Sequence, residues 1–483
     1  METGFGRATL WGTFKTDRVQ ADDIDVRAFV VRGDGCTGAL AVADLCLLWP
    51  STCMHIRDKI ARMLKVPPEN VGIFTTQNHA VPYGDDDKMF NQKLLDKAFE
   101  NAVRKAECNV QPAEIAGVKM HPKPPMNLCR RLHIKGFGAF TFYYGYRAIA
   151  PGKTDLSHML KTALSSLAKG EPYQLRGYEV KGDSATDFKV PPAPIAVKKP
   201  LYARKPDDDA LQALFFRTPK GKAIGSVVRF AAHPASADAQ SATYCSGDYP
   251  AYLRRRVEKV FGGTTLFLGG PCGDQCAQVG RRSVVTAKKI GERIANLAIS
   301  GLRHASWKED GIVAVSSPRA ALAVRKDYPK SMQAAEKRAA ELAEEIKALA
   351  AKGGSLKRIK RLSDEYEFNL YIGDRSINCW TGLDTDRLKG RTIHTPLFLL
   401  RIGQWAIAGL PGEPFGRFSS RMRKETIGDR LIVAEEANGY FVYLPTAREY
   451  MHGSYEVNAA LFGPGTEHVL VKTVRKAMRG LGF

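Results

Sequence analysis

Four polar residues that lie far apart in the chain each follow a run of apolar residues. They are His79, His233, Glu413 and Tyr443, in the segments GIFTTQNHAVP, GSVVRFAAHP, WAIAGLPGEPF and EEANGYFVYLPT. In each segment a strand-like run ends in small, Gly or Pro residues, which puts the polar side chain at the carboxyl end of a strand. Ligand sites in open α/β sheets form at that edge. Imidazole, carboxylate and phenolate groups together suit a hard-to-borderline ion such as zinc, so the pattern indicates a metal site.

The first third of the chain alternates strand and helix patterns, as a scaffold for such a site would. Residues 25–33 and 71–76 are apolar runs of strand length. A helix is expected over 53–64, with Ser51 as its cap. A second, amphipathic helix is expected over 88–108. This order predicts a parallel or mixed sheet covered by helices.

Later segments continue the pattern. Two apolar strands flank the turn TPKGK at 218–222, which predicts a hairpin. Residues 331–351 are helix formers at almost every position, and the glycines at 353–354 end that helix. We interpret about 329–366 as a helical hairpin inserted on the domain surface, a segment too short to favour a coiled-coil partner site. The whole chain, 1–483, is expected to form one large α/β domain.

The charge of the chain is its least ordinary property. Lys and Arg exceed Asp and Glu by 22, and the isoelectric point is near 9.6. Such an excess attracts anions by long-range electrostatics, and the alternative is simply a solvated basic surface. The basic runs come with no zinc-finger pattern, aromatic RNP-type strand or P-loop, so nucleic acid is not an expected partner.

Cysteine usage and the absence of targeting patterns bear on the compartment. The nine cysteines are an odd number without framework spacing, which favours reduced thiols. The first residues show no basic segment followed by an apolar one, so no secretory signal is expected. The most apolar stretches are short and are interrupted by Asp44 or Arg401, which argues against a transmembrane segment. A cytoplasmic protein is the expectation.

Five stretches together resemble a known family. They are TTQNHAVP, RFAAHP, GPCGDQC, LPGEPF and YLPTAREY. In their order along the chain and in their residues, they are similar to the N-terminal, catalytic domain of the neutral/alkaline (non-lysosomal) ceramidases. The similarity runs from about Gly4 to the segment near Leu461, without the C-terminal β-sandwich of the family. It implies a ceramidase-like α/β fold and zinc-dependent amide hydrolysis, with His233, Glu413 and Tyr443 as ligands.

One departure from the family falls on a ligand. The first histidine of the family's His-x-His stretch binds zinc, and Gln77 stands at that position, while the second histidine is kept as His79. A neutral amide oxygen is a poorer zinc ligand than imidazole. Three alternatives remain: Gln77 is a weak ligand, His79 replaces it, or the ion is absent and the pocket serves binding. If His79 is not a ligand, it is a candidate to protonate the leaving amine or to bind the oxyanion.

A second departure falls on the nucleophile. The catalytic serine of the family corresponds to Cys276, at the end of GPCGDQC. A thiolate in such a turn acts as a nucleophile if a nearby cation lowers its pKa. The alternative is a Gly turn with small buried thiols at Cys272 and Cys276. Arg147 lies where the family has an arginine near its substrate, which makes it a further catalytic candidate.

Two hypotheses follow for function. The first is a metal-dependent hydrolase that acts on an amide (C–N) bond of a small-molecule substrate, for which the positive charge favours an anion. The second, motivated by Gln77 and Cys276, is a degenerate ceramidase-like homologue that binds a ligand or serves as an accessory protein without hydrolysis. The sequence leaves the substrate and the oligomeric state open.

Overall fold

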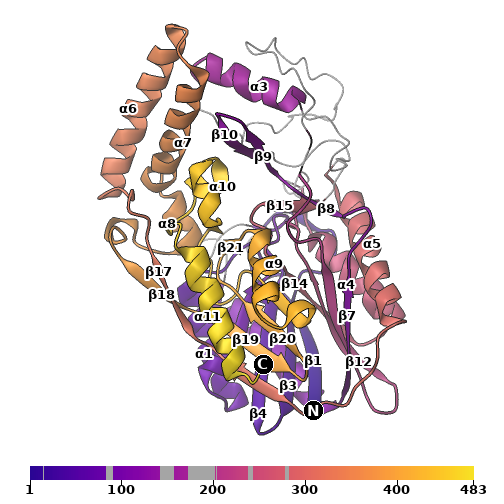
Figure 1. The fold of residues 1–483 in the computed structure, drawn as a ribbon. Helices are drawn as coiled ribbons and strands as arrows, with labels where there is room; N and C mark the ends of the chain where they lie inside the picture. The colour runs from indigo at the N-terminus through magenta and orange to yellow at the C-terminus, as the bar shows by residue number, and fades with distance from the viewer. Residues whose placement is uncertain are drawn as a thin grey trace.

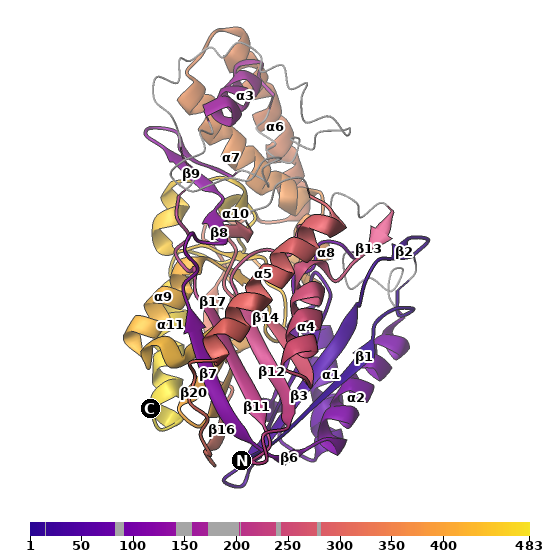
Figure 2. The same cartoon turned by 90° about the vertical axis from the view of Figure 1, so that its right-hand side faces the viewer.

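The fold is known from a computed structural model. It describes residues 1–14, 16–82, 91–141, 157–171, 202, 204–237, 243–277 and 282–483. Most strands belong to three sheets, one of five strands and two of four, arranged in layers with helices outside (Figures 1 and 2). The α/β class expected from the sequence is confirmed, although the strands divide among several sheets.

The first sheet has the strand order β5-β4-β3-β1-β6. Its strands are β1 (Glu2–Thr9), β3 (Asp25–Gly33), β4 (Cys36–Ala43), β5 (Val71–Thr75) and β6 (Gln111–Pro112). The helices α1 (Pro50–Leu64) and α2 (Gln92–Cys108) cover one face, against Val26, Ala28 and Val30. The alternate residues of β3, Phe29 and Val31, point to the opposite face, as the two-residue period of a strand requires.

A second sheet and a third sheet pack against that opposite face. The second has the order β14-β12-β11-β7, from β7 (Glu114–Met120), β11 (Leu211–Arg217), β12 (Ala223–Phe230) and β14 (Thr264–Gly269). The third has the order β16-β19-β20-β22, from β16 (Val313–Ser316), β19 (Phe398–Ile402), β20 (Trp405–Gly409) and β22 (Leu431–Ala434). One apolar core joins the three sheets, with the rings of Phe29 and Phe216 only 5.1 Å apart.

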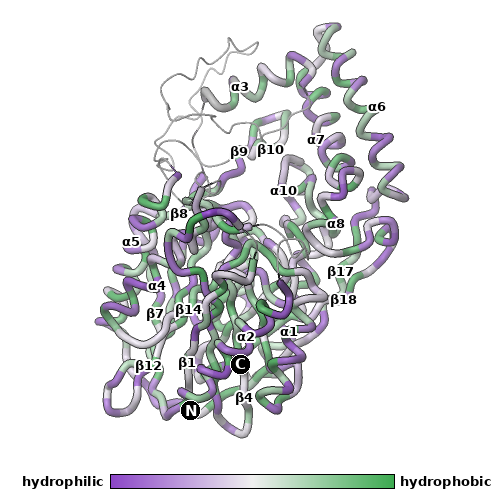
Figure 3. Tube along the Cα trace, turned by 180° about the vertical axis from the view of Figure 1, so that it is seen from behind, coloured by the Kyte–Doolittle hydropathy of each residue, from purple (hydrophilic) through white to green (hydrophobic). Residues whose placement is uncertain are grey.

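Helices close the outer faces of these two sheets. The second sheet packs against α4 (Asp248–Val260) and α5 (Val284–Leu302), and the third against α9 (Gly416–Glu425) and α11 (Thr466–Gly480). Hydrophobic residues accordingly gather along the central strands, coloured green in Figure 3. The close packing leaves no room for side chains at some positions: a Cβ on Gly4 of β1 would lie 2.0 Å from the Ala106 carbonyl oxygen of α2.

A group of helices extends from the end of the molecule opposite the two termini (Figure 1). It contains α3 (Ser157–Ala168), α6 (Met332–Ala351) and α7 (Leu356–Gly373), beside the hairpin of β9 (Arg131–Ile134) and β10 (Gly138–Thr141). Ser331 caps α6 by accepting a hydrogen bond from the Ala334 amide. A separate apolar cluster that includes Leu164, Ile346 and Ile359 holds these elements together.

The remaining elements are short. They are β2 (Val19–Gln20), β8 (Asn127–Cys129), β13 (Tyr244–Cys245), β15 (Gln275–Ala277), β17 (Arg319–Ala323), β18 (Thr392–Pro396), β21 (Glu413–Pro414), β23 (Tyr443–Leu444), α8 (Ser376–Thr381) and α10 (Tyr455–Asn458). The hairpin around residues 218–222 is confirmed as the antiparallel pair β11–β12. The cap expected at Ser51 is wrong: Pro50 already begins α1, so Ser51 lies inside the helix. None of the helices in the described ranges is long and apolar enough to cross a membrane.

Candidate functional site

The candidate residues meet where three parallel strand pairs end. Each large sheet contains one such pair: β4–β5, β12–β14 and β20–β22. Gln77 and His79 follow β5, His233 follows β12, and Glu413 follows β20. Because the chain leaves all three sheets at the same edge, residues that are far apart in sequence come into contact: Gln77 and Glu413 both lie within hydrogen-bonding distance of His233, 156 and 180 positions away.

His233 is the centre of this cluster. Its Nδ1 lies 2.9 Å from the Gln275 carbonyl oxygen, which can only accept, so Nδ1 carries a proton and donates it. Its Nε2 lies 3.0 Å from Glu413 Oε2 and 3.1 Å from Gln77 Nε2. Burial, and then the positive charge of Arg130, lower the pKa of His233, so the imidazole is neutral at neutral pH. The lone pair of Nε2 therefore faces Glu413 and Gln77.

Glu413 is held in its ionised form. The Tyr440 hydroxyl donates to its Oε1 over 2.5 Å. Although burial opposes ionisation, the contact with His233 and the hydrogen bond from Tyr440 lower the pKa of the Glu413 carboxyl. Tyr443 pairs with Glu413 in the short parallel ladder β21–β23. The Tyr443 ring packs 5.2 Å from the ring of Tyr455.

The backbone around this cluster is strained. Gln77, Glu436, Asn438 and Val442 have φ values of 58°, 58°, 58° and 53°, which side chains other than glycine rarely adopt. Strain of this kind costs free energy and tends to gather at functional sites. The turn at Gln77 aims its side-chain amide at His233 and also brings Gln77 Oε1 to 3.7 Å from the Cys272 thiol.

Three further polar residues belong to the cluster, and two of them, Glu435 and Glu436, were missed by the sequence interpretation. Cys272 Sγ lies 3.2 Å from His233 Nδ1, and its thiol donates to Glu435 Oε1 over 2.8 Å. Glu436 accepts a hydrogen bond from the Thr75 hydroxyl over 2.7 Å. Burial, reinforced by the charge of Glu413, raises the pKa of both Glu435 and Glu436 well above the usual range, so both are protonated at neutral pH. The sequence did hold a signal, since EE directly follows the apolar strand LIVA.

His79 lies beside the cluster. Its ring is 5.6 Å from the ring of His233, and its backbone amide donates to the Pro234 carbonyl over 3.0 Å. Burial, and then the neighbouring His233, lower the pKa of His79 to about 3. The imidazole is therefore neutral near pH 7, where it offers one N–H donor and one lone pair rather than a charge.

The two thiols that follow β14, those of Cys272 and Cys276, are protonated rather than ionised. Cys276 lies in β15, beside His233 through a backbone bridge, and its side chain is buried. Burial raises the pKa of Cys276 to about 12, and that of Cys272 well above its usual value. These features favour the packing alternative for Cys276. Arg147, the remaining catalytic candidate, lies outside the described residues.

Two side chains of the cluster, His233 and Glu413, have the donor chemistry of a divalent-ion site. The Nε2 lone pair of His233 points inward, and Glu413 beside it is ionised. The oxygen and nitrogen of the Gln77 amide exchange places by rotation, which would turn Oε1 toward the same point. Across the described ranges, however, no three His, Cys, Asp or Glu side chains are grouped so as to hold a metal ion. A site with one imidazole and an amide oxygen is expected to bind an ion more weakly than a site with two or three imidazoles.

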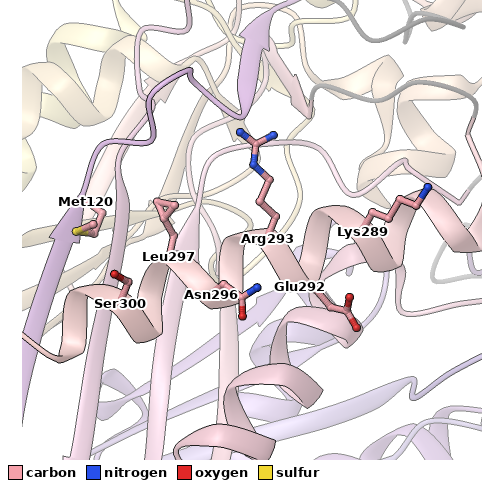
Figure 4. Close-up of a pocket in the computed structure, with 7 residues that line it drawn as sticks. All are labelled: Met120, Lys289, Glu292, Arg293, Asn296, Leu297 and Ser300. Atoms are coloured by element: carbon pink, nitrogen blue, oxygen red, sulfur yellow. The ribbon is translucent and has the colours of Figure 1, made fainter.

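Two hollows lie outside the buried cluster. One, of about 290 Å³, borders the candidate site and is lined by residues that include Asp274, Phe415 and Thr446. The other, of about 470 Å³, lies along α5 on the outer face of the second sheet (Figure 4). Apart from Met120 of β7, its side chains, such as Arg293 and Asn296, belong to the surface of α5, and none of them is a candidate site residue.

Comparison with known proteins bears on the fold. No protein-family model matches the chain, and no curated protein matches it. The structure of the neutral ceramidase from Pseudomonas aeruginosa matches with a TM-score of 0.61 and 15% identity, over 99% of this chain and 74% of that chain. A structure described as ceramidase complexed with C2 matches with the same TM-score and identity, over 99% and 75%. The resemblance inferred from the motifs is confirmed at the level of structure: this chain has a neutral ceramidase-like fold.

Proposed function

We propose that the protein is a hydrolase that cleaves an amide (C–N) bond, with its reaction centre at His233 and Glu413. The observation that carries the proposal is the contact of His233 Nε2 with Glu413 Oε2 at 3.0 Å and Gln77 Nε2 at 3.1 Å. The three side chains follow the carboxyl ends of strands from three different sheets, in a fold that resembles that of ceramidases. A purely structural role would not explain why strained backbone and protonated acids surround them.

We also propose that a divalent ion, with zinc as the first candidate, binds here. His233 and Glu413 would hold it, and Tyr443 and the rotated amide of Gln77 would complete the ligand set. Such an ion polarises a carbonyl group and lowers the pKa of a bound water to about 7. The Gln275 carbonyl fixes the tautomer of His233, and Tyr440 fixes Glu413, so both side chains are oriented before substrate arrives.

Amide hydrolysis also needs a proton for the leaving amine. Glu436 is suited to give one, because it is buried and its Oε1 makes no hydrogen bond within the described residues. Its raised pKa keeps a proton on the carboxyl at neutral pH. The neutral imidazole of His79 is suited to donate an N–H hydrogen bond to a developing oxyanion.

One observation favours the second hypothesis, a ligand-binding or accessory homologue without hydrolysis. As placed, the Gln77 side chain presents an N–H donor, not an oxygen, to the lone pair of His233. In that orientation the amide takes the position an ion would need. By the family resemblance, Cys276 also replaces the catalytic serine, and its thiol is protonated.

Zinc content and a matched pair of variants test the proposal. The parent protein, dialysed against zinc, should retain one ion per chain, and His233→Gln should abolish it. His468→Gln, an exposed residue of α11, should retain it. A parent without stoichiometric zinc and without activity on N-acyl amides, in which Gln77→His with Cys276→Ser creates both, would establish the second hypothesis instead.

A further inference from the structure

A cavity of about 290 Å³ opens beside the candidate site, between segments that also build it. Asp274 in its wall directly precedes Gln275, whose carbonyl orients His233. Arg417 follows Glu413 by four positions, and Thr446 follows Tyr443 by three. The cavity therefore borders the reaction centre through three of the segments that carry it.

The acidic side chains of the cavity are matched by nearby cations. Glu449 accepts hydrogen bonds from Arg131 Nε over 3.0 Å and from His133 Nε2 over 2.8 Å. Although burial opposes it, these contacts lower the pKa of Glu449 to about 2. Asp207 forms an ion pair with Arg204 over 3.8 Å. Each of these two carboxylates therefore already has a cationic partner.

Two arginines of the cavity remain unmatched. Arg417 and Arg448 are exposed, and neither forms an ion pair with any residue that the structure describes. The Thr446 hydroxyl is a further donor, and it makes no hydrogen bond with any of the described residues. Arg417 also lies in the first turn of α9, whose N-terminal end carries partial positive charge. All of these groups favour a negatively charged ligand.

The third acid of the cavity, Asp274, does not cancel this preference. Its Oδ1 accepts a hydrogen bond from the Gly416 amide over 2.7 Å, and the side chain is buried. Burial, and then the charge of Asp207, raise the pKa of Asp274 to about 7. Below about pH 7 the neutral form of the carboxyl predominates, so its repulsion of an anion is weakened.

We propose that this cavity binds an oxyanion of the substrate, a carboxylate or a phosphate, between Arg417 and Arg448. The guanidinium group presents a planar fork of N–H donors that matches such oxygens. Since the cavity borders the reaction centre, the substrate class is an acyl amide that also carries an anionic group, such as an N-acyl amino acid. The assignment of the anion to the substrate rests on the proposed function, whereas anion binding itself does not.

Calorimetry with a matched pair of ligands tests the inference. N-lauroylglycine carries the carboxylate, and N-lauroylglycinamide has the same acyl amide without the charge. We expect the parent protein to bind the first at least about 10-fold more tightly, at about 0.3 M salt, where nonspecific attraction to a basic surface is screened. Arg417→Gln combined with Arg448→Gln should abolish the difference. The control, Arg430→Gln combined with Arg479→Gln, removes two exposed arginines outside the cavity and should leave it intact.

The outcomes separate this inference from the proposed hydrolysis. The measurement is repeated in His233→Gln, where hydrolysis is blocked and the preference for the charged ligand should persist. Equal affinity for the two ligands in the parent, or a preference that survives the loss of Arg417 and Arg448, overturns the inference whatever the activity. Inorganic phosphate should compete with N-lauroylglycine. Phosphate binding without any preference for N-lauroylglycine would show a free-anion site and overturn the substrate assignment.

Discussion

Two buried polar clusters lie near the ends of the second and third sheets, and their charges are arranged in opposite ways. In the first, Asp208 accepts hydrogen bonds from Arg229 and, over 2.7 Å, from Arg423. Arg229 also donates to the Val433 carbonyl and to the Ser419 hydroxyl, each over 2.9 Å. Although burial opposes it, the two guanidinium groups hold the pKa of Asp208 well below its usual range.

The His233 cluster has acids without matching cations. It brings together Glu413, Glu435 and Glu436, and none of the three forms an ion pair with an arginine or lysine of the described chain. Only Glu413 is ionised, and the other two acids stay protonated. In the Asp208 cluster the opposite charges balance and support the fold. The His233 cluster keeps acids that are able to react, at a cost in stability.

The largest effect is expected from breaking the matched cluster. Arg229→Met leaves Asp208 buried with one of its two guanidinium partners and removes hydrogen bonds to three backbone or side-chain oxygens. The free energy of unfolding should fall by about 3–5 kcal/mol, measured by urea denaturation. Arg430→Met, at an exposed site, should change it by less than about 0.5 kcal/mol. A loss below about 1 kcal/mol for Arg229→Met would contradict a structural role for this cluster.

A pH-dependent effect is expected at Asp274. Its pKa is about 7 in the folded protein, above the ordinary value of 3.8, so the carboxyl stabilises the fold when protonated. That stabilisation is complete below about pH 3.8 and is lost as pH rises through about 7. Between about pH 5.5 and 7 the parent should lose about 2 kcal/mol relative to Asp274→Asn, whose side chain still accepts from Gly416. Parallel stability curves for the two proteins over this range would contradict the buried, protonated state.

A smaller gain is expected from restoring a ligand. Gln77→His replaces an amide with an imidazole that faces His233 and Glu413. Zinc affinity should rise about 10-fold, measured by competition with a chelator. In Gln77→Asn, which keeps the amide but shortens the side chain, it should not rise. Unchanged affinity in Gln77→His would show that position 77 does not face the ion.

The smallest effect is expected for an unmatched acid. Glu435 is protonated, so Glu435→Gln replaces one neutral, hydrogen-bonded group with another of the same shape. The free energy of unfolding should change by less than about 1 kcal/mol in the same urea assay, against 3–5 kcal/mol for Arg229→Met. A loss as large as that of Arg229→Met would erase the distinction between the two clusters.

The strands and the positions of the site residues along them could be predicted because they depend on local patterns. His233 and Glu413 each follow an apolar run in the sequence, and in the structure these runs are the strands β12 and β20. The division into three sheets could not be predicted, because strand pairing is not local: β20 pairs with β22 across α9. For the same reason the sequence singled out Cys276, while the turn brings Cys272 to His233.

Hydrolysis of N-lauroylglycine shows whether His233 and Glu413 form the reaction centre, with zinc supplied and released lauric acid measured by mass spectrometry. Glu413→Gln keeps the shape of the side chain and its contact with Tyr440, but removes the negative charge beside His233. The rate should fall at least about 100-fold relative to the parent. Glu341→Gln, at an exposed position of α6, should leave the rate unchanged. Hydrolysis by Glu413→Gln at the rate of the parent would contradict a reaction centre at His233 and Glu413.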